Sequence, residues 1–361
     1  MLYQYHVPNP SADGLPENSI PKLFERDGII VIRQFASPEE VAGMKGQMAA
    51  LIDAWDPADS KGSVFHTYGS TRINQEYFLE SAATVRFFLE PEAVDKEGAV
   101  RTDIPKDGLI NKAGHALHFL DPVFAAYSQS EKVKQLVRSL GYIDPVLPQS
   151  MYIFKQGKIG GEVTSHQDST FLFTEPQQTC LGLWLALDDA TLDNGCLWAR
   201  RGSHREAVRS VFRRTPPETP DGDIVLRNEM VDANGDEVEG TAGFRAREWT
   251  NKIPGGCADY GDASSASLAD AGFEALPVKA GDLVCFAGTL DHLSLANRTS
   301  NARHTFQLHL VEGPNGSNDA NGSKNDNGST GANGSKGVKW SDGNWMQYPE
   351  GLVFPSLGLA P

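Results

Sequence analysis

The second half of the chain consists of short runs of β-branched, aromatic and leucine residues, and this pattern restricts the fold more than any other feature. Glycine, proline, asparagine and aspartate separate the runs, as is typical of an antiparallel sandwich or barrel. The runs are QSMYIFKQ (149–156), TFLFTEP (170–176), CLGLWLAL (180–187), DLVCFAG (282–288), HLSLAN (292–297) and RHTFQLHLVEG (303–313). We therefore predict a mostly β fold with a core of short strands.

Helical patterns are confined to the first 141 residues. Ser37-Pro-Glu-Glu40 is a capping box with proline at the first helical position, and apolar residues then recur at helical spacing as far as Ile52. A second helix is predicted from Ser130 to Gly141. A short strand over 28–35 precedes the first helix. We expect the helices to form a layer that covers the β core.

The chain is expected to form a single domain over 1–361 with two inserts. Residues 206–278 are polar and rich in glycine and aspartate, which predicts a long, loop-rich insertion. Residues 315–337 repeat Asn-Gly-Ser every six positions and have no apolar face, so we expect a flexible, low-complexity insert. Residues 338–361 contain tryptophans and prolines and are predicted to pack back on the core.

Charge and cysteine content limit the class of partner. The formal net charge of −15 argues against nucleic acid and against an anionic membrane surface. No stretch approaches 18 apolar residues, and the first residues lack the pattern of a secretory signal. The four cysteines form no C-x-x-C pair, which favours reduced thiols. We expect a cytoplasmic protein with a small-molecule substrate; the oligomeric state stays open.

The segment Ser-His-Gln-Asp-Ser-Thr-Phe (165–171) places a histidine and a carboxylate two positions apart. About one such pair is expected by chance in this composition, so His166 and Asp168 alone decide little. On a strand, residues i and i+2 share a face, and two histidines with one carboxylate leave positions open on non-haem iron. The second histidine is expected from a distant strand, and four follow in the sequence: His204, His292, His304 and His309.

His292 is favoured because of the residues that follow it. Arg303 lies 11 residues later, and a guanidinium would bind the far carboxylate of 2-oxoglutarate in a bidentate way. Ser294 shares the face of His292 and could add a hydroxyl to the same carboxylate. The competing interpretation is that the histidines and Arg303 are ordinary core or surface residues.

Three longer motifs resemble the phytanoyl-CoA dioxygenase family of iron- and 2-oxoglutarate-dependent oxygenases. They are SMYIFKQGKIGGEVTSHQDSTFLFTEP, ALDDATLDNGCLW and GSH. The resemblance runs from about residue 20 to the terminal NWMQYPEGLVFPSL, apart from the two inserts. It departs at Ala199-Arg-Arg-Gly-Ser-His204, where the family tends to have proline before Gly-Ser-His. The fold that it implies is a double-stranded β-helix, a cupin-like jelly roll with flanking helices.

The resemblance also implies a set of site residues. Those that it places at the iron are His166, Asp168 and His292. Those that it places around 2-oxoglutarate are Lys112, Met151, Trp184, Ser294 and Arg303. Spacing alone would not select Lys112, Met151 and Trp184, which would otherwise be interpreted as a surface lysine and two ordinary core residues.

The implied reaction uses Fe(II), 2-oxoglutarate and O2. It hydroxylates an unidentified small molecule and releases succinate and carbon dioxide, and the carboxylate of Asp168 favours hydroxylation over halogenation. Desaturation or ring formation at the same site is an alternative outcome. A non-catalytic jelly-roll binding or scaffold protein, and a metal-dependent jelly-roll enzyme that does not use 2-oxoglutarate, are the other hypotheses.

Overall fold

The computed structural model describes residues 4–6, 20–60, 63–64, 75–215, 224–230, 265–313 and 338–359. The predicted 315–337 insert lies outside the described residues, as does most of the 206–278 insertion. The division into one domain with two inserts therefore stays a prediction. Within the described part of the chain, no helix has the length and apolar character needed to cross a bilayer.

Strands dominate the order of elements, as the sequence pattern predicts. The helices are α1 (Ile20–Asp27), α2 (Pro38–Ala54), α3 (Gln75–Glu80), α4 (Leu117–Leu120), α5 (Pro122–Ser128), α6 (Glu131–Ser139) and α8 (Ser265–Asp270). The strands are β1 (Gln4–His6), β2 (Ile29–Arg33), β3 (Val85–Leu89), β4 (Ile110–His115), β5 (Pro145–Lys155), β6 (Val163–His166), β7 (Thr174–Glu175), β8 (Leu181–Ala186), β9 (Leu197–Ala199), β10 (Ser210–Thr215), β11 (Val225–Met230), β12 (Glu274–Leu276), β13 (Leu283–Ala287), β14 (His292–Ser294), β15 (Arg303–Glu312) and β16 (Lys339–Trp340).

Two sheets form the core. The large sheet has eight strands in the order β1-β2-β13-β8-β15-β5-β4-β3, and the small sheet has four in the order β12-β9-β14-β6. Side chains of both sheets share one apolar cluster: Trp184 and Val284 of the large sheet pack with Trp198 and Leu293 of the small one. The two sheets therefore face each other, and the predicted mostly β, jelly-roll fold is confirmed.

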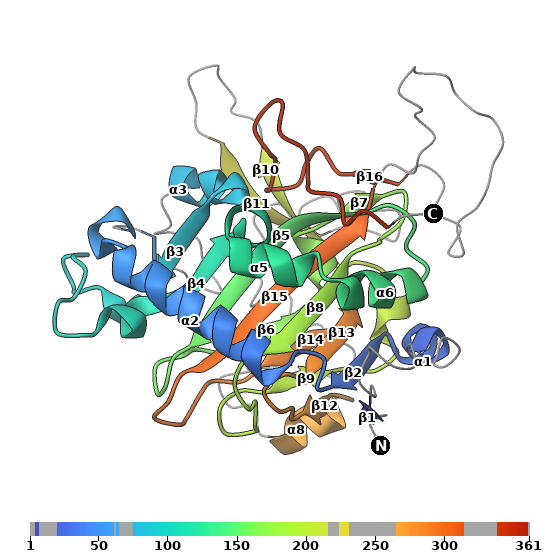
Figure 1. Ribbon diagram of the computed structural model, residues 1–361, viewed down its shortest axis with the longest axis horizontal. Coiled ribbons are helices and arrows are strands. Elements are labelled where there is room, and N and C mark those ends of the chain that lie inside the picture. The colour runs from blue at the N-terminus through green and yellow to red at the C-terminus, as the bar shows by residue number, and fades with distance from the viewer. Residues whose placement is uncertain are drawn as a thin grey trace.

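Helices cover the outer face of the large sheet, as predicted. Figure 1 shows α2 and α5 lying across the strands. Met44 and Met48 of α2 and Phe124 of α5 pack with Leu183 and Phe306 of the sheet. The capping box that begins α2 is present: the Glu40 amide donates to Ser37 Oγ at 3.2 Å, and the Ser37 amide donates to the Glu40 carboxylate at 2.7 Å.

Strand β15 gives its two faces opposite characters. Successive side chains alternate across a strand, so Phe306, Leu308 and Leu310 enter the core under the helices. The alternate residues point to the inner face, toward the small sheet: Arg303, Thr305, Gln307 and His309. The outward-facing side chains of β15 thus stabilise the apolar core, and the inward-facing side chains form a polar surface between the sheets.

The prediction of a strand over 170–176 is wrong. The chain leaves β6 at His166 and turns through a 3-10 helix at Asp168–Thr170, because the amides of Phe171 and Leu172 donate to the Asp168 carbonyl at 2.9 and 3.1 Å. Only Thr174–Glu175 is strand. Leu172 and Phe173 of this run are buried without pairing in a sheet, which sequence periodicity does not distinguish from burial in a strand.

The C-terminal segment contributes to an aromatic cluster beside β3 and β4. The Trp345 ring lies 4.4 Å from the Phe78 ring and 5.2 Å from the His115 ring, measured between centroids. Met346 and Phe88 belong to the same buried cluster. Trp345 and Met346 thus pack at the end of the large sheet where Lys112 also lies.

Candidate metal centre

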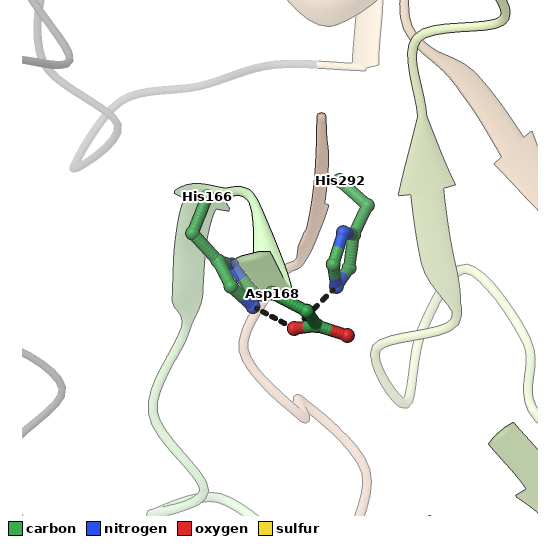
Figure 2. A group of neighbouring side chains, drawn as sticks. All are labelled: His166, Asp168 and His292. Carbon is green, nitrogen blue, oxygen red and sulfur yellow. Dashed lines mark ion pairs between the residues drawn. The ribbon is translucent and has the colours of Figure 1, made fainter. Parts of the chain in front are cut away.

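His166, Asp168 and His292 meet between β6 and β14. The strand register places His292 directly opposite His166, and the turn after β6 brings the Asp168 carboxylate in front of both rings (Figure 2). Asp168 Oδ1 lies 3.4 Å from His166 Nε2 and 3.7 Å from His292 Nε2. One donor atom from each residue falls within 4.8 Å of the other two. Two imidazole nitrogens and one carboxylate oxygen so arranged can hold a single divalent ion.

The two histidines are oriented for metal binding by backbone carbonyls. His166 Nδ1 lies 2.8 Å from the Thr164 carbonyl, and His292 Nδ1 lies 3.0 Å from the Leu290 carbonyl. Because a carbonyl only accepts, each Nδ1 donates to it and each Nε2 is left to face Asp168. Burial lowers the pKa of His166, but the Asp168 carboxylate outweighs it and holds the pKa above its ordinary value. Burial, together with the neighbouring His166, lowers the pKa of His292 to about 4, so this ring is in the neutral form that binds metals.

His309 supports the carboxylate from behind. His309 Nε2 lies 2.9 Å from Asp168 Oδ2, and the Gln149 amide nitrogen lies 3.2 Å from His309 Nδ1. The amide donates to Nδ1, so Nε2 donates to Asp168 and Oδ1 is left to face the two ligand histidines. Burial raises the pKa of Asp168, but His309 and His292 outweigh it and hold the pKa well below its usual value.

Sequence reasoning treated His309 only as one of four possible ligands. Its position six residues after Arg303, on the same inward alternation of β15, was a signal that would have placed it inside. The other candidates have partners elsewhere: His204 Nε2 contacts the Glu25 carbonyl, and His304 Nδ1 contacts the Tyr152 hydroxyl. Two further histidines, His115 of β4 and His118 of α4, are buried and contact the hydroxyls of Ser81 and Ser150.

Arg303 is buried on the inner face without full hydrogen bonding. Its exposed fraction is 2%, and its Nε and Nη1 atoms have no hydrogen-bond partner among the described residues. The guanidinium carbon lies 5.1 Å above the Trp184 ring, and burial lowers the pKa of Arg303 to about 10. Unpaired buried N–H groups are costly, and a planar carboxylate is the ligand that fits this fork.

The remaining residues implied by the family resemblance share the face of Arg303. In the register of the large sheet, Met151 and Trp184 both lie opposite Gln307, and Lys112 pairs with Ile153. Trp184 belongs to the cluster between the sheets, so this row points inward.

Lys112 is 5% exposed, and its ammonium lies 5.0 Å above the Phe88 ring. Burial lowers the pKa of Lys112 to about 7. A buried amine of this kind is receptive to an anionic ligand.

Two threonines at the site were not anticipated. Thr305 of β15 and Thr164 of β6 are buried, and within the described ranges neither Oγ1 has a hydrogen-bond partner. Thr305 lies between Arg303 and His309 on the inward alternation of β15, and Thr164 is two residues before His166. Single threonines in strands carry no sequence signal of this kind, because strand propensity alone explains them.

The Ser294 hydroxyl is engaged by the backbone of a neighbouring segment. It lies two residues after His292 in β14 and is buried. Its hydroxyl donates to the Gly195 carbonyl at 2.8 Å, so its proton is already used, and a contact to a carboxylate requires rotation of the side chain. Gly195 has a φ of +81°, and an added Cβ would collide with the Leu295 carbonyl. The close approach that fixes Ser294 therefore depends on glycine.

Comparison with known proteins agrees with the motifs. The sequence model of the family described as phytanoyl-CoA dioxygenase matches residues 24–305. The chain is 33% identical to the phytanoyl-CoA dioxygenase domain-containing protein 1 homolog of Caenorhabditis elegans, over 92% of this chain and 96% of that protein. It is 38% identical to phytanoyl-CoA dioxygenase 1 of Oryza sativa subsp. japonica, over 84% of this chain and 91% of the relative.

A solved structure shares the fold at low sequence identity. It is described as the non-heme alpha ketoglutarate dependent epimerase SnoN from nogalamycin biosynthesis, with a TM-score of 0.50, 14% identity and coverage of 97% of both chains. This likeness concerns the fold alone. The family match and the curated relatives show that the chain belongs to the phytanoyl-CoA dioxygenase family.

Proposed function

We propose that this protein is an iron(II)- and 2-oxoglutarate-dependent dioxygenase that acts on a small molecule. The observation that carries the proposal is the buried guanidinium of Arg303, with unpaired Nε and Nη1 atoms in the described structure. His309, on the same face of β15 as Arg303, contacts Asp168 of the His166, Asp168 and His292 cluster. A metal centre alone does not require such an arginine. The rice relative, named as a phytanoyl-CoA dioxygenase, and SnoN, described as alpha ketoglutarate dependent, support the same assignment.

Each residue has a distinct role in this proposal. His166 Nε2, His292 Nε2 and Asp168 Oδ1 hold the iron, and His309 fixes the carboxylate. Arg303 binds the far carboxylate of 2-oxoglutarate in a bidentate way. When bound, iron and 2-oxoglutarate supply an oxidative decarboxylation that yields succinate and carbon dioxide and activates O2 for transfer to the substrate.

Lys112, Met151 and Trp184 line the same inner face, with Thr305 beside them. In the proposal the Lys112 ammonium adds positive charge for the co-substrate, and Trp184 packs against the Arg303 guanidinium. Met151 supplies an adaptable apolar surface. The Thr305 hydroxyl, which is buried without a partner in the described residues, offers a further donor to a bound carboxylate.

Aromatic side chains beside the metal ligands point to a substrate with an apolar part. The Phe171 ring lies 6.3 Å from the His166 ring, and the Phe212 ring of β10 lies 5.6 Å from Phe171. Both rings are only partly buried. We propose that they contact the substrate and exclude water from the centre.

The test is turnover of 2-oxoglutarate. Purified protein is supplied with Fe(II), 2-oxoglutarate and O2, and succinate is quantified by mass spectrometry. The wild type is expected to release succinate, whereas Asp168→Ala and Arg303→Met are expected to release none above background. His304→Gln is the matched control, because His304 lies next to Arg303 on β15 but bonds Tyr152 instead.

Equal succinate release by wild type and Arg303→Met would contradict the role proposed for Arg303. No succinate from a folded, metal-loaded wild type would contradict the use of 2-oxoglutarate and favour an enzyme with another metal chemistry. A substrate screen then follows on the wild type. A product mass gain of one oxygen distinguishes hydroxylation from desaturation or ring formation, which the same site would also support.

A further inference from the structure

We infer that Asp291 is a positioning residue that holds the two ligand histidines at a fixed separation and joins them to residues 200–209. The inference rests on the proposed function, because it takes His166 and His292 as metal ligands. Asp291 immediately precedes His292, and Ser165 immediately precedes His166. Asp291 is completely buried, with an exposed fraction of 0%, so its carboxylate belongs to the interior of the protein.

A direct hydrogen bond links the two positions that precede the ligands. Ser165 Oγ donates to Asp291 Oδ1. His166 and His292 lie opposite each other in the β6–β14 register, and successive side chains point to opposite faces of a strand. The bond between Ser165 and Asp291 therefore lies on the face of the sheet opposite the imidazoles. It joins the two strands at the position of the metal ligands.

Two arginines neutralise the buried carboxylate. Arg209 reaches it with Nη1 3.0 Å from Oδ2 and Nη2 3.0 Å from Oδ1. Arg200 Nη2 lies 3.3 Å from Oδ2 and also pairs with Glu206 at 2.5 Å. A buried carboxylate is stable only when it is paired and hydrogen-bonded. The cluster thus fixes the geometry of Asp291 and links it to the segment that carries both arginines.

Residues 200–209 also form hydrogen bonds with Asp291 and Gln167, which are sequence neighbours of the metal ligands. The Asp291 amide donates to Ser203 Oγ at 2.9 Å, and the Arg200 amide donates to the Asp291 carbonyl at 3.0 Å. Gln167 lies between His166 and Asp168, and its side-chain oxygen accepts from the Arg209 amide at 3.1 Å. Its side-chain nitrogen donates to the Thr289 carbonyl at 2.8 Å. Residues 200–209 therefore form hydrogen bonds with both segments that carry metal ligands, one at His166 and one at His292.

Neighbouring arginines of this segment pair with two different buried aspartates. Arg201, immediately before Gly202, pairs with Asp27 and also with Glu274. Arg200, beside it, pairs with Asp291. The two arginines make two separate buried clusters, one at the metal centre and one at α1.

The second cluster supplies a matched control. Asp27 is 4% exposed and is also held by two arginines, Arg26 at 2.6 Å and Arg201 at 2.9 Å. Its partner Arg201 belongs to residues 200–209, but Arg201 pairs with Glu274 of β12 rather than with the ligand strands. Asp27→Asn and Asp291→Asn therefore each remove one buried negative charge that is paired with two arginines. Asp291 is adjacent to the ligand His292 in the sequence, whereas Asp27 is not adjacent to a ligand.

The experiment measures Co(II) binding to the metal-free protein, by calorimetry and by the visible spectrum of the bound ion. Asp291→Asn is expected to weaken Co(II) binding by about tenfold to a hundredfold, as loss of an outer partner does at other metal sites, and to change the shape of the spectrum. Ser165→Ala is expected to act in the same direction with a smaller loss. Asp27→Asn is expected to lower the melting temperature but to leave Co(II) affinity and spectrum unchanged.

A folded Asp291→Asn protein with wild-type affinity and spectrum would overturn the inference while leaving the proposed function intact. If Asp291→Asn does not fold, Ser165→Ala decides, because the loss of one hydroxyl leaves both arginine pairs in place. Equal losses in Asp27→Asn and Asp291→Asn would reduce the effect to general stability and also overturn the inference. Failure of the wild type to bind Co(II) would overturn the proposed function, and the inference with it.

Discussion

The two faces of the large sheet use the same strands for opposite purposes. On the outer face, β15 contributes Phe306, Leu308 and Leu310 to an apolar core under the helices. On the inner face it contributes Arg303, Thr305 and His309, which are buried as deeply as the apolar residues. Burial thus does not distinguish the two faces of β15. Polar chemistry does, since Arg303 and Thr305 keep polar atoms without partners in the described structure.

This difference between the two faces of β15 indicates that the inner face is less stable than it could be and is suited to binding a ligand. Apolar burial on the outer face stabilises the fold by roughly 25 cal/mol for each Å² removed from water. A buried polar group without a partner costs about 1–3 kcal/mol. Conflicts between local satisfaction and the global fold are expected at functional sites, and Arg303 and Thr305 place two of them on the inner face of β15. Substitutions on the outer and on the inner face of the large sheet test this difference.

The largest effect is expected from Phe306→Ala on the outer face. Phe306 is fully buried, and its ring lies 4.9 Å from Phe124. Loss of the ring should lower the free energy of unfolding by about 3–5 kcal/mol, measured by urea denaturation. The metal affinity of the folded fraction should be unchanged. A selective loss of metal affinity without loss of stability would contradict the division between the faces.

Arg303→Met is expected to stabilise the protein, in contrast to Phe306→Ala. Removal of a buried guanidinium with unpaired N–H groups should raise the free energy of unfolding by about 1–3 kcal/mol, while 2-oxoglutarate binding is lost. Arg33→Met is the control, because the Arg33 guanidinium is paired with Asp282 at 2.5 Å and its loss should destabilise. If both variants destabilise equally, Arg303 is a structural residue.

Lys112 should make stability depend on pH. Its pKa in the folded protein is about 7, below its ordinary value, so above pH 7 the unfolded chain binds more protons at this residue. Stability should therefore rise between pH 6 and pH 8, by about 1 kcal/mol from this group, and the rise should disappear in Lys112→Met. Over the same range 2-oxoglutarate affinity should fall as the ammonium is lost. A wild-type profile identical to that of Lys112→Met would exclude the buried lysine as the cause.

The smallest effect is expected from Thr305→Val. The Thr305 hydroxyl is buried without a partner in the described residues, so its removal should stabilise the protein by up to about 1 kcal/mol. Ser128→Ala is the comparison on the outer side, because Ser128 Oγ donates to the Phe124 carbonyl at 2.7 Å, and it should destabilise. Thermal unfolding of the two variants without added ligands gives the signs directly.

The fold and the central residues could be predicted because they depend on local patterns. The strand runs, the capping box at Ser37 and the His166-x-Asp168 motif are all short-range features, and the structure brings His166, Asp168 and His292 together. Their role as iron ligands stays a proposal. The turn at 168–170 was missed because an apolar run does not reveal whether sheet pairing or a 3-10 turn buries it.

The supporting residues could not be predicted because their partners are remote in the sequence. His309 lies 141 positions from Asp168, and Ser165 lies 126 positions from Asp291. No periodicity links such pairs, and each residue alone has an ordinary explanation. The unpaired state of Arg303 is likewise a property of the assembled interior, which emerges only when every neighbouring side chain is in place.

The most direct measurement is anaerobic addition of Fe(II) and then 2-oxoglutarate, followed in the visible range. The expected result is a weak charge-transfer band of the iron chelate in the wild type, which is absent in His166→Ala and reduced in Arg303→Ala. The two substitutions test the two parts of the proposed site, the His166 cluster of the small sheet and the unpaired Arg303 of the large sheet. A folded, metal-loaded wild type that shows no band would contradict the assignment of this site to iron and 2-oxoglutarate.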